Sequence, residues 1–130
     1  MHETQFSKKQ YIEPTVTPGP CEMQTLDSYT IFFSWNAIPE SKVPGRFLGY
    51  RITYKERDSN LSNVILVDPT SLQRTVNTFQ AYTWYWVEIA GYSNGGIGPP
   101  CMPFVFRTPE GGKKLSIIYF FVDYNFFILS

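Results

Sequence analysis

Histidine and cysteine are scarce in this chain. It contains one histidine, His2, and two cysteines, Cys21 and Cys101. Two cysteines are too few for a disulfide framework, although they could form a single bridge. Their spacing with His2 matches no zinc-binding pattern. We therefore predict no metal site.

The groups that enzymes use for catalysis are missing or dispersed. No histidine follows position 2, the carboxylates are scattered through predicted linkers and turns, and no glycine-rich loop follows a strand and opens a helix. Catalysis needs a nucleophile with a base, paired carboxylates or a metal. We predict a protein that is not an enzyme and needs no cofactor.

The chain also lacks net charge and a visible secretory signal. Eleven basic residues balance eleven acidic ones, which gives no electrostatic case for nucleic acid or an anionic membrane surface as a partner. The first residues, MHETQFSKKQYIEP, contain no apolar stretch of the kind that signal peptides carry. Either the protein is cytosolic, or the chain lacks its true start.

What the chain does contain is typical of a globular β protein. Hydrophobic residues are 43% and charged residues 17%, which argues against disorder. Aromatic residues reach 18%, and they favour strands and large buried side chains. A length of 130 residues suits one domain with short extensions.

The pattern along the chain predicts an all-β sandwich. Residues 1–17 are polar and are interpreted as a flexible linker, and prolines at 14, 18 and 20 stiffen the start of the domain. Turn signals then separate strand-like runs at the spacing of a sandwich. The predicted strands are 21–26, 30–35, 48–55, 63–68, 72–76, 83–92 and 102–108. Neither helical periodicity nor an internal repeat is evident.

Strict alternation in two of these runs assigns an inner and an outer face. In 48–55 the apolar residues alternate with polar ones, and in 83–92 a compact apolar set alternates with a set that mixes tryptophan and glutamate. Residues 93–98 are glycine-rich and predict a hairpin, because glycine accepts positive φ. The predicted core comprises Trp35, Tyr50, Ile52, Tyr54, Phe79, Tyr85, Val87 and Ile89.

Several stretches in a fixed order carry a family resemblance. Trp35 closes the second run, GYRITYK forms the third, Phe79 stands six residues before Tyr85, YWVEIAGYSNGGIGPP forms the sixth run and its hairpin, and FRTPE ends the last. In this order they resemble a fibronectin type III domain over residues 18–108. The resemblance implies a seven-stranded antiparallel, immunoglobulin-like β-sandwich. Gly91 and Ser93 replace residues common in the family, alanine and asparagine, and we expect no effect on the fold.

The resemblance implies structural roles for three residues. Tyr85 stands at a tyrosine-corner position, whose hydroxyl bonds the backbone a few residues upstream, although a plain core aromatic is the alternative. In this fold the first and last strands start at one pole, where Cys21 and Cys101 lie. A disulfide between them is our hypothesis for a secreted chain, and two free thiols are the alternative in a reducing compartment.

Candidate partner contacts lie on the outer face of the sheet. Arg51 and Lys55 are expected to neighbour Trp84 and Trp86, because basic side chains can lie across indole rings. These residues either only cover the sheet, which we favour, or form a contact patch, since tryptophan and arginine are enriched at binding hot spots.

The loops supply further candidates. Arg46 and Asn94 lie in loops at the ends of predicted strands, where sandwich scaffolds carry recognition. Asn60 begins the N-glycosylation sequon Asn-Leu-Ser in a polar turn. No Arg-Gly-Asp tripeptide is present, so integrin binding through that motif is not predicted.

Residues 109–130 are predicted to form a tail outside the domain, apolar from position 115. Its apolar part, 115–130, is 16 residues long and so is shorter than the roughly 20 apolar residues that span a bilayer, and it contains Asp123 and Asn125. It is a truncated membrane segment, a translated non-coding extension, or an extra strand on the sheet. We favour the second, because the run would expose apolar surface. We interpret the chain as a fragment of something longer.

Taken together, the resemblance implies a non-catalytic interaction or spacer module of a cell-adhesion molecule or receptor ectodomain, such as a receptor tyrosine phosphatase. The expected partner is an unidentified protein, with neighbouring fibronectin type III domains in a longer chain and a membrane reached only through the parent protein. The expected location is extracellular or at the cell surface. The alternatives are an intracellular structural module and a cytokine-receptor-like module, although the Trp-Ser-x-Trp-Ser motif of the latter is absent.

Overall fold

The computed structural model describes residues 14–101, 103–111, 118–122 and 125–129. The regular elements within these residues are strands, apart from one short 3₁₀ helix. The elements in chain order are β1 (Cys21–Thr25), β2 (Ile31–Trp35), η1 (Glu40–Lys42), β3 (Phe47–Glu56), β4 (Asn63–Val67), β5 (Gln73–Val76), β6 (Trp84–Ser93), β7 (Gly96–Ile97), β8 (Phe104–Arg107), β9 (Ile118–Val122) and β10 (Asn125–Leu129).

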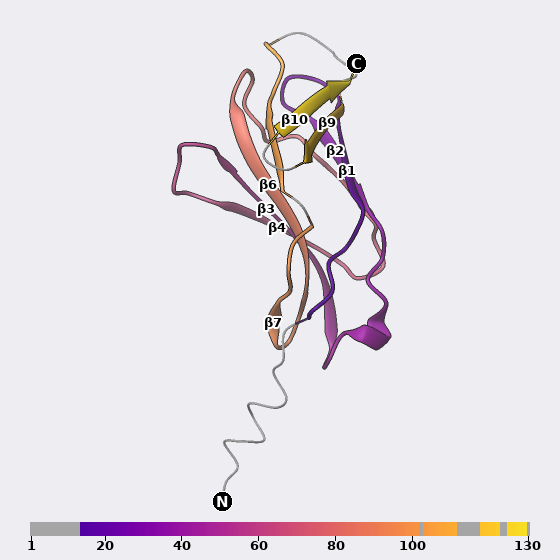
Figure 1. The fold of residues 1–130 in the computed structure, drawn as a ribbon. Coiled ribbons are helices and arrows are strands. Elements are labelled where there is room, and N and C mark those ends of the chain that lie inside the picture. Colours follow the sequence, from indigo (N-terminus) through magenta and orange to yellow (C-terminus); the bar gives the residue numbers. More distant parts are fainter. Residues whose placement is uncertain (1–13, 102, 112–117, 123–124, 130) are drawn as a thin grey trace, which may run out of the picture.

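Two antiparallel sheets pack face to face (Figure 1). One has the strand order β1-β2-β5. The other has the order β4-β3-β6-β7, and β8 pairs with the beginning of β6 on the same edge as β7. The predicted all-β, immunoglobulin-like sandwich is therefore confirmed.

The differences from the predicted strands lie in the loops. β7 occupies part of the segment predicted as a hairpin, and Pro99 and Pro100 separate it from β8 because proline has no N–H to donate to a ladder. The loop before β3 contains η1, whose turn is closed by hydrogen bonds from the N–H groups of Lys42 and Val43 to the carbonyls of Pro39 and Glu40.

Side chains of alternating parity from the two sheets fill the core. Successive residues of a strand point to opposite faces, and β2 and β6 each place every second residue inside. Trp35 lies 5.3 Å from Tyr50 between ring centroids, and Phe79 packs edge-on against Tyr85 at 4.8 Å. All eight residues of the predicted core are buried: Trp35, Tyr50, Ile52, Tyr54, Phe79, Tyr85, Val87 and Ile89.

The hydroxyl of Tyr85 fixes the loop that precedes β6. It accepts a hydrogen bond of 2.7 Å from the backbone N–H of Gln80, five residues upstream, as a tyrosine corner requires. Thr108, which is buried, donates its own hydroxyl to the carbonyl of Gln80 at 2.6 Å and accepts one from the N–H of Thr83. Burial raises the pKa of the Tyr85 hydroxyl above its ordinary value. No pattern in the sequence indicates that Thr108 makes these two bonds.

Two buried glycines allow close approach between elements. Gly49 has φ of +142° at an irregularity in the pairing of β3 with β6, and a Cβ there would overlap the carbonyl oxygen of Val67 on β4. A Cβ on Gly91 would lie 2.5 Å from Cδ1 of Ile38. Glycine at position 91, where the family often has alanine, therefore makes room for the side chain of Ile38. We expected this replacement to have no effect on the fold, and the sequence did not indicate this packing role.

The described part of the tail has regular backbone. β9 and β10 pair as an antiparallel hairpin, and β9 lies beside β1 of one sheet and β8 of the other (Figure 1). The interpretation of the tail as a translated extension, and its two alternatives, stay predictions, because among the described residues β9 and β10 pair only with each other. The domain boundaries at 18 and 108 stay predictions.

Candidate functional site

The outer face of the larger sheet carries four of the six predicted contact residues. Lys55 lies directly opposite Trp86, so this expected pair is formed. Arg51 lies opposite Ala90, four residues from Lys55 along β3, which is about 13 Å at the rise of an extended strand. The register therefore separates Arg51 from Trp84 and Trp86, contrary to our expectation.

Other arginines lie over the tryptophan at this end of the sheet. The guanidinium carbon of Arg57 lies 4.7 Å from the ring centroid of Trp84, and that of Arg107 lies 5.8 Å from the same ring and 4.2 Å from the ring of Tyr82. Arg107 is opposite Trp84 in the register. Sequence reasoning missed both arginines, because they lie at or just beyond strand ends. The signal was present for Arg57, which is two residues from Lys55 and so has the same parity.

Arg51 instead lines a hollow of about 240 Å³ on the same outer face. The Nε atom of Arg51 is buried and has no hydrogen-bond partner within the described residues. The other residues lining the hollow are Thr53, Glu88, Ala90, Ile97, Gly98 and Pro100. The hollow is therefore mainly apolar, with one cation and one carboxylate.

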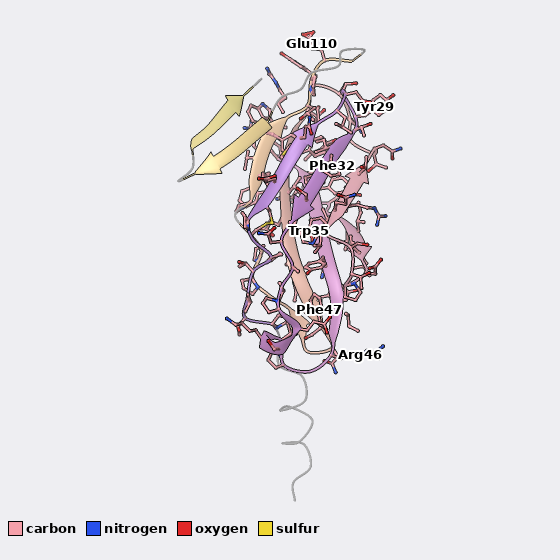
Figure 2. All side chains as sticks on the ribbon, turned by 90° about the vertical axis from the view of Figure 1, so that its right-hand side faces the viewer. Tyr29, Phe32, Trp35, Arg46, Phe47 and Glu110 are labelled. Carbon is pink, nitrogen blue, oxygen red and sulfur yellow. A yellow bond between two sulfur atoms is a disulfide. The ribbon has the colours of Figure 1, made fainter. Side chains whose placement is uncertain are left out.

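The two predicted loop candidates meet at one pole. The backbone N–H of Arg46 donates to Oδ1 of Asn94 at 3.1 Å, and the N–H of Asn94 donates to the carbonyl of Arg46 at 3.2 Å. Both residues are exposed. Figure 2 shows Arg46 at the pole opposite Tyr29 and Glu110. These reciprocal bonds link the loop before β3 to the β6–β7 turn, so the two loops form one surface.

A disulfide joins Cys21 and Cys101, the pair named in our hypothesis, with a Cα–Cα distance of 6.4 Å. Cys21 begins β1, and Cys101 precedes β8. The N–H of Cys101 also donates to the carbonyl of Ile89 on β6. The bridge thus links the outer strand of the smaller sheet to the segment between β7 and β8 of the larger one.

Asn60 of the sequon is exposed in the turn between β3 and β4, and the next residue, Leu61, is 80% exposed. The N–H of Leu61 donates to the hydroxyl of Ser59. Because Asn60 is exposed, the geometry permits modification.

Asp68, which is exposed in the turn after β4, has its pKa lowered mainly by the hydroxyl of Thr70, with the Thr70 N–H and the Ser71 hydroxyl adding to the effect. Within the described residues, no group of three or more His, Cys, Asp or Glu side chains could hold a metal ion. In the same part of the chain, no helix has the length and apolar character needed to cross a membrane.

Comparison with known proteins gives one family and a consistent set of relatives. A sequence model of the fibronectin type III domain matches residues 16–107. A putative receptor-type tyrosine-protein phosphatase, mosPTP-1 of Aedes aegypti, is 30% identical over 110 residues, which cover 80% of this chain and 8% of the relative. Human contactin-6 is 30% identical over 100 residues, 75% of this chain and 10% of the relative. The human neural cell adhesion molecule L1-like protein is 25% identical over 116 residues, 83% and 9% respectively. The chain thus spans about a tenth of the length of these relatives or less.

Solved structures agree on the fold. The third fibronectin III domain of human KIAA0343 protein superposes with a TM-score of 0.70 at 21% identity, covering 80% of this chain and 89% of that one. The FN5 domain of Drosophila Lar gives a TM-score of 0.60 at 26% identity, covering 75% of this chain and 99% of that domain.

Proposed function

The chain belongs to the fibronectin type III family, and from this we propose that it serves as a non-catalytic protein-binding or spacer module of a cell-adhesion or receptor-type protein. The relatives support this role, because they include contactin-6, an L1-like adhesion molecule and a receptor-type phosphatase. The phosphatase match covers only 8% of that relative, so it gives this chain no catalytic role.

The observation that favours an extracellular location is the disulfide between Cys21 and Cys101. Disulfides persist in oxidising compartments and are rare in the cytosol, where thiols are kept reduced. The bridge therefore favours a secreted or surface-exposed parent protein over the intracellular structural alternative.

We place partner contacts on two surfaces. The first is the loop surface, where Arg46 and Asn94 are held together by reciprocal hydrogen bonds. The second is the outer face of the larger sheet, with Arg51, Lys55, Trp84 and Trp86. A rigid sandwich holds both in fixed positions, and neighbouring domains of the same family in a longer chain are the other expected partners.

The test of location uses antibodies raised against the 130-residue chain. Intact cells of the source are labelled with a membrane-impermeant reagent and blotted with and without N-glycosidase. We expect a labelled band well above the 15.0 kDa of this chain, which falls on digestion. Labelling that appears only after permeabilisation would refute the extracellular proposal.

A matched variant separates glycosylation from location. The full chain is secreted from cultured cells behind an added signal sequence, as wild type and as Asn60→Gln. We expect N-glycosidase to shift the wild type and leave the variant unchanged, because Asn60 is exposed within a sequon. A wild-type chain that shows no shift would remove the glycan from the proposal while leaving the surface labelling to decide location.

A further inference from the structure

Cations and tryptophans gather on one end of the outer face of the larger sheet. We call this end the basic aromatic surface, and it consists of Lys55, Arg57, Trp84, Trp86 and Arg107. β6 supplies both tryptophans, while β3 with its following turn and β8 flank them. The N–H of Arg57 donates to the carbonyl of Trp84 at 2.9 Å, so the backbone ladder continues to this last row.

Stacking prepares Arg57 for binding an anion. Its guanidinium lies over Trp84, and the N–H donors of a guanidinium lie in its own plane, so an indole below that plane does not consume them. The side chain is exposed, and neither Arg57 nor Lys55 forms an ion pair with a carboxylate of the described residues. Holding the fork in one orientation lowers the entropy lost when it bonds a carboxylate in two places.

Apolar surface lies beside these charges. Trp86, opposite Lys55, is 38% exposed, and Val105 on its other side is partly exposed. A ligand made only of charged groups would leave this surface unused. Lys55 lies in β3 and Arg57 is the first residue of the turn that follows it, so the two cations lie within two residues of each other at the edge of this apolar surface.

We propose, on the basis of the protein-binding role above, that the basic aromatic surface binds an extended acidic segment of a partner protein that also carries aromatic or aliphatic side chains. Alternate carboxylates of that segment contact Lys55 and Arg57, and an apolar side chain packs on Trp86. The surface is distinct from the loop surface at Arg46, which lies at the other pole.

The test selects peptides from a random twelve-residue phage library against the full chain, and then measures the affinity of synthesised peptides by fluorescence polarisation. We expect enrichment of Asp and Glu together with aromatic residues. Arg57→Ala and Lys55→Ala should each weaken binding about tenfold or more, as expected for a lost bond to a charged group. Arg57→Lys should also weaken binding, because lysine keeps the charge but loses the stacked fork. Raising the salt concentration should lower the affinity.

Arg46→Ala is the matched control, because it removes one arginine from the opposite pole. Peptides that lose affinity with Arg46→Ala and not with Arg57→Ala would keep the protein-binding role and refute this surface. Neutral or basic consensus sequences, or no binding peptide at all, would overturn the proposal, while surface labelling of cells tests the module's role separately.

Dextran sulfate that binds more tightly than the peptides, and loses affinity in Arg57→Ala, would assign the surface to a polyanionic polysaccharide instead. Unfolding midpoints of each variant confirm that the exposed substitutions leave the fold intact.

Discussion

Breaking the bridge between Cys21 and Cys101 should remove much of the stability of the domain. The two cysteines are 80 residues apart in the sequence, so the bridge closes a loop that holds most of the sandwich. In the unfolded chain this closure restricts the conformations that are available, and reduction releases them. Reduction leaves every side chain in place, so it tests the cross-link separately from packing.

The magnitude follows from the length of the loop. For about 80 residues the chain-entropy relation gives about 15 cal/mol/K, or about 4.5 kcal/mol at 25 °C. Small domains have a total stability of about 5–15 kcal/mol, so the reduced protein would be marginally stable. At a urea slope of about 1.5 kcal/mol per molar, the midpoint of unfolding should fall by about 3 M.

The assay is urea unfolding of the full chain, followed by tryptophan fluorescence with and without a phosphine reductant. Thiol counting under denaturing conditions should give no free thiol before reduction and two afterwards. A double Cys→Ala variant should unfold near the reduced midpoint, with an added packing loss because Cys101 is buried. A change below about 1 kcal/mol on reduction of a fully bridged sample would refute the entropy argument, and two thiols before reduction would refute the bridge itself.

Three further changes test other parts of the fold. Tyr85→Phe should lower the free energy of unfolding in urea by about 1–3 kcal/mol, because the backbone N–H of Gln80 loses its acceptor. An unchanged midpoint would show that this hydrogen bond does not stabilise the domain. Gly49→Ala should cost at least about 3 kcal/mol, since its Cβ would overlap a carbonyl of β4 at positive φ. Gly111→Ala should be nearly neutral, because a Cβ there would meet only Cβ of Ala81, at an ordinary contact distance of 3.9 Å, and similar losses for the two variants would contradict this. The hydrogen bonds that lower the pKa of Asp68 stabilise the fold at a pH above 3.8, the pKa of this group in the unfolded chain. This contribution is lost as the pH falls through the lower pKa of Asp68 in the folded protein. Thr70→Val should flatten that acid dependence of the unfolding midpoint, and an unchanged profile would show that its hydroxyl is not the cause.

The positions of the strands, and the face of the sheet on which each side chain lies, could be predicted from the sequence, because both depend on local alternation of apolar and polar residues. The parity of β3 and β6 placed Tyr50 and Val87 inside without knowledge of any partner strand. Register was not readable, because it depends on which turn closes each pair. Arg51, Lys55 and Arg57 share one parity, and only the register shows that Arg57 is the one that lies above Trp84.

Contacts between segments far apart in the chain could not be predicted from the sequence either. Gly91 was treated as equivalent to alanine, yet Ile38 from the loop after β2 occupies the space that its missing Cβ leaves. Thr108 bonds the carbonyl of Gln80 across 28 residues. Neither contact has a periodic signature, because each arises only when the two sheets meet.

β6 contributes both to the stability of this domain and to its proposed recognition surface, through side chains on the two opposite faces of the strand. Tyr85 and Val87 point into the core, while Trp84 and Trp86 point out, so the two sets occupy alternate positions of one strand. A substitution at an outward position therefore changes the binding surface at little cost to the core, whereas a shift of one residue would exchange the two faces and destroy both. This alternation allows the outward residues to differ without disturbing the packing of the inward ones. It also identifies where specificity should be sought: in the residues that flank the two tryptophans, Arg57 and Lys55, rather than in the buried aromatics that hold the sheets together.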